Sequence, residues 1–122
     1  MTYYYAHSVY KYNTPIEQYE LSLIPGKVIN PNGIVDQTKS EKEIMKHCYS
    51  LIDKCNALVF SSVDGVIGRG VAGEITHAFI RNKDVYYIHG NRLHKIKSIV
   101  IKPIESSNNC RIYATFEYGV TE

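Results

Sequence analysis

The sequence has 122 residues, of which 44% are hydrophobic and 21% charged, and 14 basic side chains against 12 acidic ones give a formal charge of +2. This ordinary composition excludes a disordered tail or a collagen-like fibre, and the charge offers no basic stripe for duplex DNA. The length predicts one domain over residues 1–122. Because no apolar run approaches the ~20 residues of a membrane helix and the N-terminus lacks a signal-peptide pattern, we expect a soluble, cytoplasmic protein without a membrane partner.

The first third of the sequence predicts strands and a helix in alternation. An aromatic-rich strand is expected at residues 2–6, with a polar loop after it. Thr14-Pro15-Ile16-Glu17 has the residues of a capping box, so a helix is expected to begin there and to end at Pro25-Gly26. A second strand follows at residues 27–29, and the turn cluster Asn30-Pro31-Asn32-Gly33 ends it.

The middle of the sequence continues this alternation. A second capping box at residues 40–43 predicts a helix whose apolar stripe reaches Cys55. The apolar run Ala57-Leu58-Val59-Phe60 is typical of a central parallel strand. A third helix is expected to open at Gly68-Arg69-Gly70, and a fourth strand is expected at residues 85–88.

The C-terminal part predicts a different structure. Residues 96–101 and 111–118 both indicate strands, and the polar turn at residues 105–109 joins them into a terminal hairpin. The whole order predicts an α/β fold, a three-layer sandwich with a mostly parallel, Rossmann-like or flavodoxin-like sheet and a C-terminal β-hairpin. Right-handed crossovers would place every strand-to-helix loop at the C-terminal edge of this sheet, where ligands of such folds bind.

The cysteines and tyrosines give two further indications. Cys48, Cys55 and Cys110 are odd in number and form no C-x-x-C pair, so we expect small buried side chains of a reduced compartment and no metal site. The chain has eleven tyrosines and no tryptophan. Most tyrosines are expected to pack on half-buried strands, while tyrosine also suits oligomer interfaces and stacks on bases.

The candidate ligand-binding residues come from three loops at the expected C-terminal edge: His7, Ser8, Tyr10, Tyr12, Asn30, Asn32, Ser62, Asp64, Gly68, Arg69, Gly70 and Val71. Glycines before a helix let the backbone approach a ligand, and the helix N-terminus offers N–H groups to a phosphate or a ribose hydroxyl. A flexible start of the helix is the alternative interpretation. One of the two loop tyrosines is expected to cover a base.

Glu74 is the candidate catalytic residue. On a helical wheel it falls beside the apolar stripe, one turn into the third helix, so its carboxylate can reach over the strand ends. The helix dipole favours an ionised carboxylate there, as a nucleophile requires. An ordinary solvated helix glutamate is the alternative.

Four stretches carry a resemblance to a known family: Tyr4-Tyr5-Ala6-His7, Asn30-Pro31-Asn32, residues 55–62 and the G-x-x-x-E-x-x-x-A pattern of residues 70–78. Together they resemble the nucleoside 2-deoxyribosyltransferase-like superfamily, including its small phage and prokaryotic members, over about residues 3–88. The resemblance implies an N-glycosidase or deoxyribosyltransferase without a cofactor, in which Glu74 attacks C1′ of a nucleoside or nucleotide and releases the base. It also implies a homodimer or larger homo-oligomer, because such proteins complete their sites across subunits.

The sequence departs from the family pattern at three places. His7 stands where a glycine is usual, Asp64 matches a family aspartate only with altered spacing, and the hairpin from Ile96 has no counterpart in the pattern. These departures favour an alternative in which the cleft retains its ligand without cleaving it, as a phage sponge that sequesters an ADP-ribose-type or other nucleotide immune signal of the Thoeris kind. A structural oligomer subunit without a ligand is the third interpretation.

Overall fold

The computed structural model describes residues 1–104 and 113–120. In chain order the elements are β1 (Thr2–Ala6), the 3-10 helix η1 (Val9–Lys11), α1 (Pro15–Leu23), β2 (Lys27–Ile29), α2 (Glu41–Asp53), β3 (Ala57–Phe60), β4 (Ile67–Gly68), α3 (Arg69–Ile80), β5 (Asp84–His89), β6 (Arg92–Ile104) and β7 (Tyr113–Val120). The turn expected at residues 105–109, Cys110 and the first two residues of the last expected strand lie outside the described residues.

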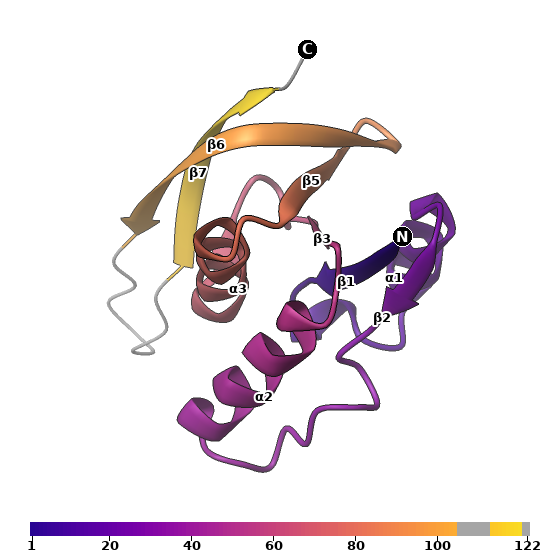
Figure 1. Cartoon of the computed structure of the whole chain (residues 1–122), viewed down its shortest axis with the longest axis vertical. Coiled ribbons are helices and arrows are strands. Elements are labelled where there is room, and N and C mark those ends of the chain that lie inside the picture. The colour runs from indigo at the N-terminus through magenta and orange to yellow at the C-terminus, as the bar shows by residue number, and fades with distance from the viewer. Residues whose placement is uncertain (105–112, 121–122) are drawn as a thin grey trace.

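The chain has an α/β fold with one mixed seven-stranded sheet in the order β2-β1-β3-β5-β6-β7-β4 (Figure 1). The strands β2, β1, β3 and β5 run parallel, whereas β5–β6, β6–β7 and β7–β4 pair antiparallel. The expectation of a mostly parallel sheet is therefore wrong. After β5 the chain reverses through Gly90 and Asn91, both with positive φ (59° and 65°), and such a tight turn makes an antiparallel neighbour without a crossover helix.

The predicted helix starts are confirmed by their caps. The Thr14 hydroxyl accepts the N–H of Glu17 at 3.3 Å, and the Ser40 hydroxyl accepts the N–H of Glu43 at 3.2 Å. The Glu17 carboxylate reaches back to the N–H of Asn13 at 3.1 Å, one residue before the expected partner. Both helices thus satisfy N–H groups that a helix start leaves unpaired.

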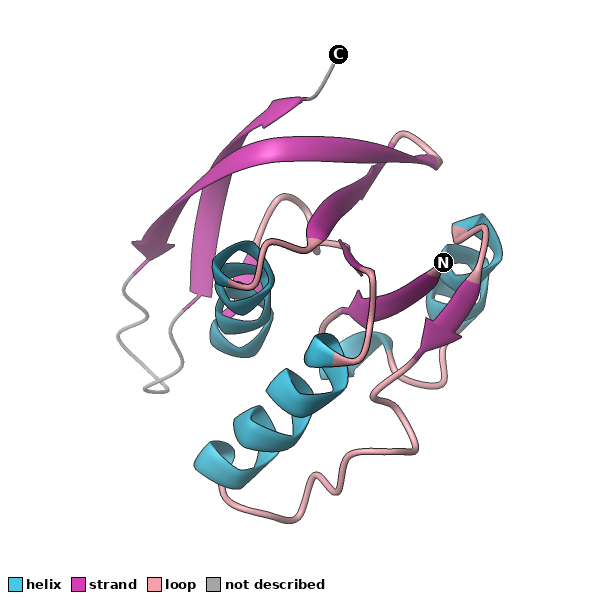
Figure 2. Cartoon of the chain, viewed as in Figure 1, coloured by secondary structure: helices cyan, strands magenta, loops and turns pink. Residues whose placement is uncertain are grey.

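Helices cover both faces of the parallel half of the sheet (Figure 2). Successive residues of β1 point to opposite faces, so Tyr3 and Tyr5 pack with Ile24 at the end of α1, while Tyr4 packs with Ile52 of α2 and Ile75 of α3. Tyr4, Tyr5, Ile52 and Ile75 are fully buried. The three consecutive tyrosines of β1 are therefore core residues, as strand packing predicts.

The C-terminal hairpin is confirmed, and it returns to the start of α3. β6 pairs with β5 through residues 92–96 and with β7 through residues 96–104. The beginning of β7 then pairs with β4, which places Tyr113 opposite Gly68 and Ala114 opposite Ile67. β4, which the sequence did not predict, brings a C-terminal tyrosine to the N-terminus of α3. No helix in the described part of the chain is long and apolar enough to cross a membrane.

Candidate functional site

A cavity of about 610 Å³ lies at the carboxyl ends of β1 and β3, against the first turns of α2 and α3. Eight of the predicted site residues line it: His7, Ser8, Tyr10, Tyr12, Gly68, Gly70, Val71 and Glu74. We expected the loops at this edge to meet at one cavity. The first loop and the start of α3 do so. The second loop contributes Pro31 and Gln37 in place of the expected asparagines.

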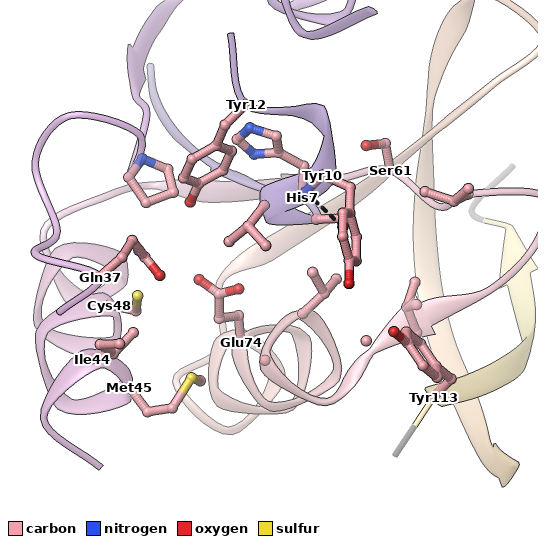
Figure 3. A pocket seen from close by; sticks show the side chains of 18 of the residues that line it. His7, Tyr10, Tyr12, Gln37, Ile44, Met45, Cys48, Ser61, Glu74 and Tyr113 are labelled. Carbon is pink, nitrogen blue, oxygen red and sulfur yellow. Dashed lines mark hydrogen bonds between the residues drawn. The ribbon is translucent and has the colours of Figure 1, made fainter. Parts of the chain in front are cut away.

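Glu74 is one of the two carboxyl side chains among the described residues that line this cavity. Its side chain rises from α3 toward the space between Tyr10 and the side chains of α2 (Figure 3). Only 6% of the residue is exposed, and its carboxyl group accepts a hydrogen bond from the hydroxyl of the fully buried Tyr4. The position beside the buried face of α3 agrees with the helical wheel. The solvated-glutamate alternative does not fit this burial.

The protonation of Glu74 differs from the expectation. Burial raises the pKa of the Glu74 carboxyl to about 7, although hydrogen bonds with Tyr4 and Cys48 oppose the rise. The helix dipole therefore does not keep the carboxyl fully ionised near neutral pH. Because both forms are present there, this group can accept a proton, donate one or act as a carboxylate. Burial and the nearby carboxyl raise the pKa of the Cys48 thiol to about 11, which leaves it neutral.

His7 lines the cavity but is held by the protein. Its Nδ1 lies 3.1 Å from the carbonyl oxygen of Tyr5, its Nε2 lies 2.7 Å from Oε2 of Glu17, and its ring stacks on that of Tyr5 at 3.7 Å. Burial alone would raise the pKa of Glu17, but hydrogen bonds from His7, the Asn13 N–H and Asn32 hold it below its ordinary value. Both nitrogens of His7 are thus engaged, and its visible role is to fix the first loop.

A second buried cluster, centred on Lys11, holds the same loop against α1 and the end of β3. The amino group of Lys11, at the end of η1, donates to Oε2 of Glu20 at 3.0 Å, to the Ser61 hydroxyl at 2.9 Å and to the carbonyl of Ser62 at 2.9 Å. The Glu20 carboxylate also accepts the hydroxyls of Ser61, at 2.7 Å, and of Tyr5. Lys11 therefore anchors η1, which contains the cavity residue Tyr10 and is followed by Tyr12, to α1 and to the end of β3.

Five predicted site residues do not line the cavity. The Asn30 side chain accepts the N–H of Asn32, and the Asn32 amide donates to Glu17 at 3.0 Å, so both close the second loop. The Ser62 hydroxyl lies 2.8 Å from that of Tyr87. The remaining two residues lie at the surface: Asp64 sits in the tight turn between Val63 and Val66 with φ 51°, and Arg69 pairs with Glu41 at 3.4 Å.

Several lining residues were not expected. Tyr4, Ile44 and Cys48 were interpreted as packing residues, while Gln37, Glu41, Met45 and Tyr113 were not singled out. The start of α2 could have been considered, since helix N-termini at this sheet edge face the ligand. Tyr113 could not have been assigned, because its place depends on the pairing of β4 with β7.

Charge and metal-binding capacity limit what the cavity can hold. The described lining residues include the acidic Glu41 and Glu74 and no lysine or arginine. Within residues 1–104 and 113–120, no group of three or more His, Cys, Asp or Glu side chains is arranged to hold a metal ion. Cys48 and Cys55 are buried and unpaired as thiols. The site is thus an aromatic and apolar cavity with a buried carboxyl group.

Comparisons with known proteins bear on the family resemblance. No family model matches this chain. No curated protein matches it, and no solved structure matches it either. The resemblance to the nucleoside 2-deoxyribosyltransferase-like superfamily therefore rests on the motifs within residues 3–88 and stays a prediction.

Proposed function

We propose that this cavity binds a nucleoside or a related N-riboside and that Glu74 acts at its C1′ atom, as in the superfamily that the motifs resemble. The observation that carries the proposal is the buried Glu74 carboxyl in the cavity wall, held by the hydroxyl of Tyr4. A buried carboxyl with a raised pKa in the wall of a cavity marks a candidate functional site, and a ribose hydroxyl or C1′ has the right chemistry to meet it.

The size and position of the cavity support the proposal. Its volume of about 610 Å³ lies within the range of roughly 300–1,000 Å³ that is usual for small-molecule sites. The parallel strands follow the order β2-β1-β3-β5, which is the flavodoxin-like order of doubly wound folds, whose ligands bind beyond the carboxyl ends of the strands. The parallel half of the sheet therefore supports the proposed Rossmann-like or flavodoxin-like fold.

The proposed reaction has two steps. The ionised Glu74 carboxylate forms a bond to C1′ while the bond from C1′ to the base nitrogen breaks and its electron pair leaves with the base. Water, or a second base, then attacks C1′ and releases the carboxylate. The Tyr4 hydroxyl holds the carboxyl group in one orientation during both steps, because a hydrogen-bonded oxygen cannot rotate freely.

Retention of an intact ligand is the second candidate function. Glycosidases of the retaining class use two carboxyl groups about 5 Å apart, one as nucleophile and one as acid. Among the described lining residues the other carboxyl is that of Glu41, which is exposed and paired with Arg69. This observation favours a binding protein that sequesters an N-riboside, such as an ADP-ribose-type signal.

Base release by Glu74→Gln and by the wild-type protein separates the two functions. Both proteins, with Glu43→Gln as a matched exposed control, are incubated with nucleosides, nucleoside monophosphates, NAD and ADP-ribose and analysed by chromatography. An enzyme releases base in the wild type and control, while Glu74→Gln binds substrate without turnover. A sequestering protein retains intact ligand after filtration in all three. Unchanged base release by Glu74→Gln would contradict the catalytic role.

A further inference from the structure

The charge of the cavity wall points to the kind of ligand that fits it. Glu41 and Glu74 supply carboxyl groups, and the described lining residues contain no lysine or arginine. Arg69 pairs with Glu41 at 3.4 Å and does not line the cavity, and the Lys11 amino group, which donates to the lining residue Ser61, is paired with Glu20. A phosphate in this cavity would find neutral hydrogen-bond donors but no cationic side chain among the described lining residues, whereas a cation would meet both carboxyl groups.

Three tyrosine rings from two segments far apart in the sequence line the cavity. Tyr10 lies within η1 and Tyr12 directly follows it, whereas Tyr113 begins β7 (Figure 3). Met45 of α2 lies on the opposite side with its polarisable sulfur. Rings of tyrosine attract a cation that lies over their faces, and the attraction grows when the cation is removed from water.

Two lining side chains that often act as acids, those of His7 and Cys48, are poorly suited to protonate a departing base, and the second carboxyl of the described wall, that of Glu41, is exposed and pairs with Arg69. Both nitrogens of His7 are engaged by Tyr5 and Glu17. The pKa of the Cys48 thiol is raised to about 11, and burial together with the Glu74 charge raises the pKa of Tyr12 above its ordinary value. A neutral base leaves as an anion unless it is protonated, whereas a positively charged base leaves as a neutral molecule and needs no acid.

These observations converge on one ligand class. We infer that the cavity takes an N-riboside whose base is a positively charged heteroaromatic ring, with the ring between the tyrosines and the ribose against Glu74 and the start of α3. This inference rests on the proposed function and narrows its ligand. If cleavage occurs, the Glu74 carboxylate bonds to C1′ while the C1′–N bond breaks and its electron pair neutralises the ring nitrogen. Water then attacks C1′, the bond from C1′ to the carboxylate breaks, and the proton lost by the water goes to solvent.

The charge can be tested with two probes of nearly equal shape. N-ribosylnicotinamide carries a cationic pyridinium ring, and its 1,4-dihydro form differs by one hydride and has no charge. Calorimetric titration of the wild-type protein with each probe, and with uridine as a neutral nucleoside, is done at pH 8. We expect the cation to bind about tenfold more tightly than its dihydro form, as cation–π and carboxylate contacts require.

Substitutions of lining residues test whether the cavity wall causes the preference for the cationic probe. Tyr113→Leu and Glu41→Gln should each weaken the cationic probe severalfold and leave the dihydro form nearly unchanged, while Glu43→Gln on the exposed face of α2 should change neither. Circular dichroism of each variant confirms that it is folded. Equal affinity for the two forms, or tighter binding of the dihydro form, would overturn the charge inference and leave the proposed function standing. Absence of binding by all three probes would overturn both.

Discussion

The hydroxyl of Tyr4 donates a hydrogen bond to the carboxyl group of Glu74, across a separation of 70 residues in the chain. Tyr4 belongs to the first strand and Glu74 to the third helix, and both side chains are buried. This contact joins the sheet to the helix that faces it at the wall of the cavity. It also fixes the carboxyl group on which the proposed function depends.

The first prediction concerns stability and pH. The pKa of Glu74 is raised from 4.5 to about 7 in the folded protein, so between these values the folded state holds a proton that the unfolded state has lost. Stability therefore falls as pH rises through this window, and the full penalty, on the order of 3 kcal/mol, is present above pH 7. Glu74→Gln should be more stable than wild type at pH 8 and gain little at pH 4. Urea unfolding of both proteins at both pH values checks this. The same difference in unfolding free energy between variant and wild type at pH 4 and pH 8 would contradict the raised pKa of Glu74.

Removal of the Tyr4 hydroxyl gives the second prediction. Tyr4→Phe keeps the ring in the core but deprives Glu74 of its donor, so the free energy of unfolding should drop by about 1–3 kcal/mol at pH 8. Because the hydrogen bond from Tyr4 lowers the pKa of Glu74, the variant should raise that pKa further. Carbon NMR titration of the Glu74 carboxyl measures it. Tyr86→Phe, on a half-buried strand position, is the control.

The buried Lys11 gives the third prediction. Lys11→Met leaves the Glu20 carboxylate buried without its cation and should cost about 3–5 kcal/mol of stability. The double variant Lys11→Met with Glu20→Gln should recover part of this loss, because no uncompensated charge remains. A double-mutant cycle in urea measures the coupling. Simple additivity of the two substitutions would show that the pair does not act as a unit.

Self-association gives the fourth prediction. Val100 and Ile104, which point to the same side of β6, are 57% and 43% exposed, and exposed apolar side chains on a strand can mark a contact between subunits. We therefore expect a homodimer or larger assembly. Light scattering at micromolar concentration measures the mass in solution. A mass equal to that of one chain would contradict it, and Val100→Lys should dissociate an assembly that uses this face.

The local part of the fold could be predicted because its signals are local. The caps at Thr14 and Ser40 and the apolar run of β3 lie within a few residues of the elements they specify. The direction of β6 depends on the tight turn at Gly90-Asn91, a dipeptide that is typical of two-residue hairpin loops. β4 is two residues long and forms by pairing with β7, so no local sequence pattern predicts it.

The candidate site was predictable to a similar extent. Glu74 could be placed because helical spacing fixes its side relative to the apolar stripe of α3. The roles of His7 and Asn32 could not be foreseen, because both depend on Glu17, which folds back from α1 to meet them. A polar loop residue has the same appearance in a sequence whether it faces a ligand or a buried carboxylate.

The central claim is that an N-riboside binds with its C1′ atom at Glu74, and a ligand-bound crystal structure of Glu74→Gln tests it most directly. Crystals grown with N-ribosylnicotinamide should show the ribose in the cavity, with C1′ roughly 3–3.5 Å from the side chain of residue 74, the separation of a near-attack arrangement. The ring should lie against Tyr10, Tyr12 or Tyr113. A ligand bound elsewhere on the protein, or one in the cavity with its ribose away from residue 74, would contradict the account.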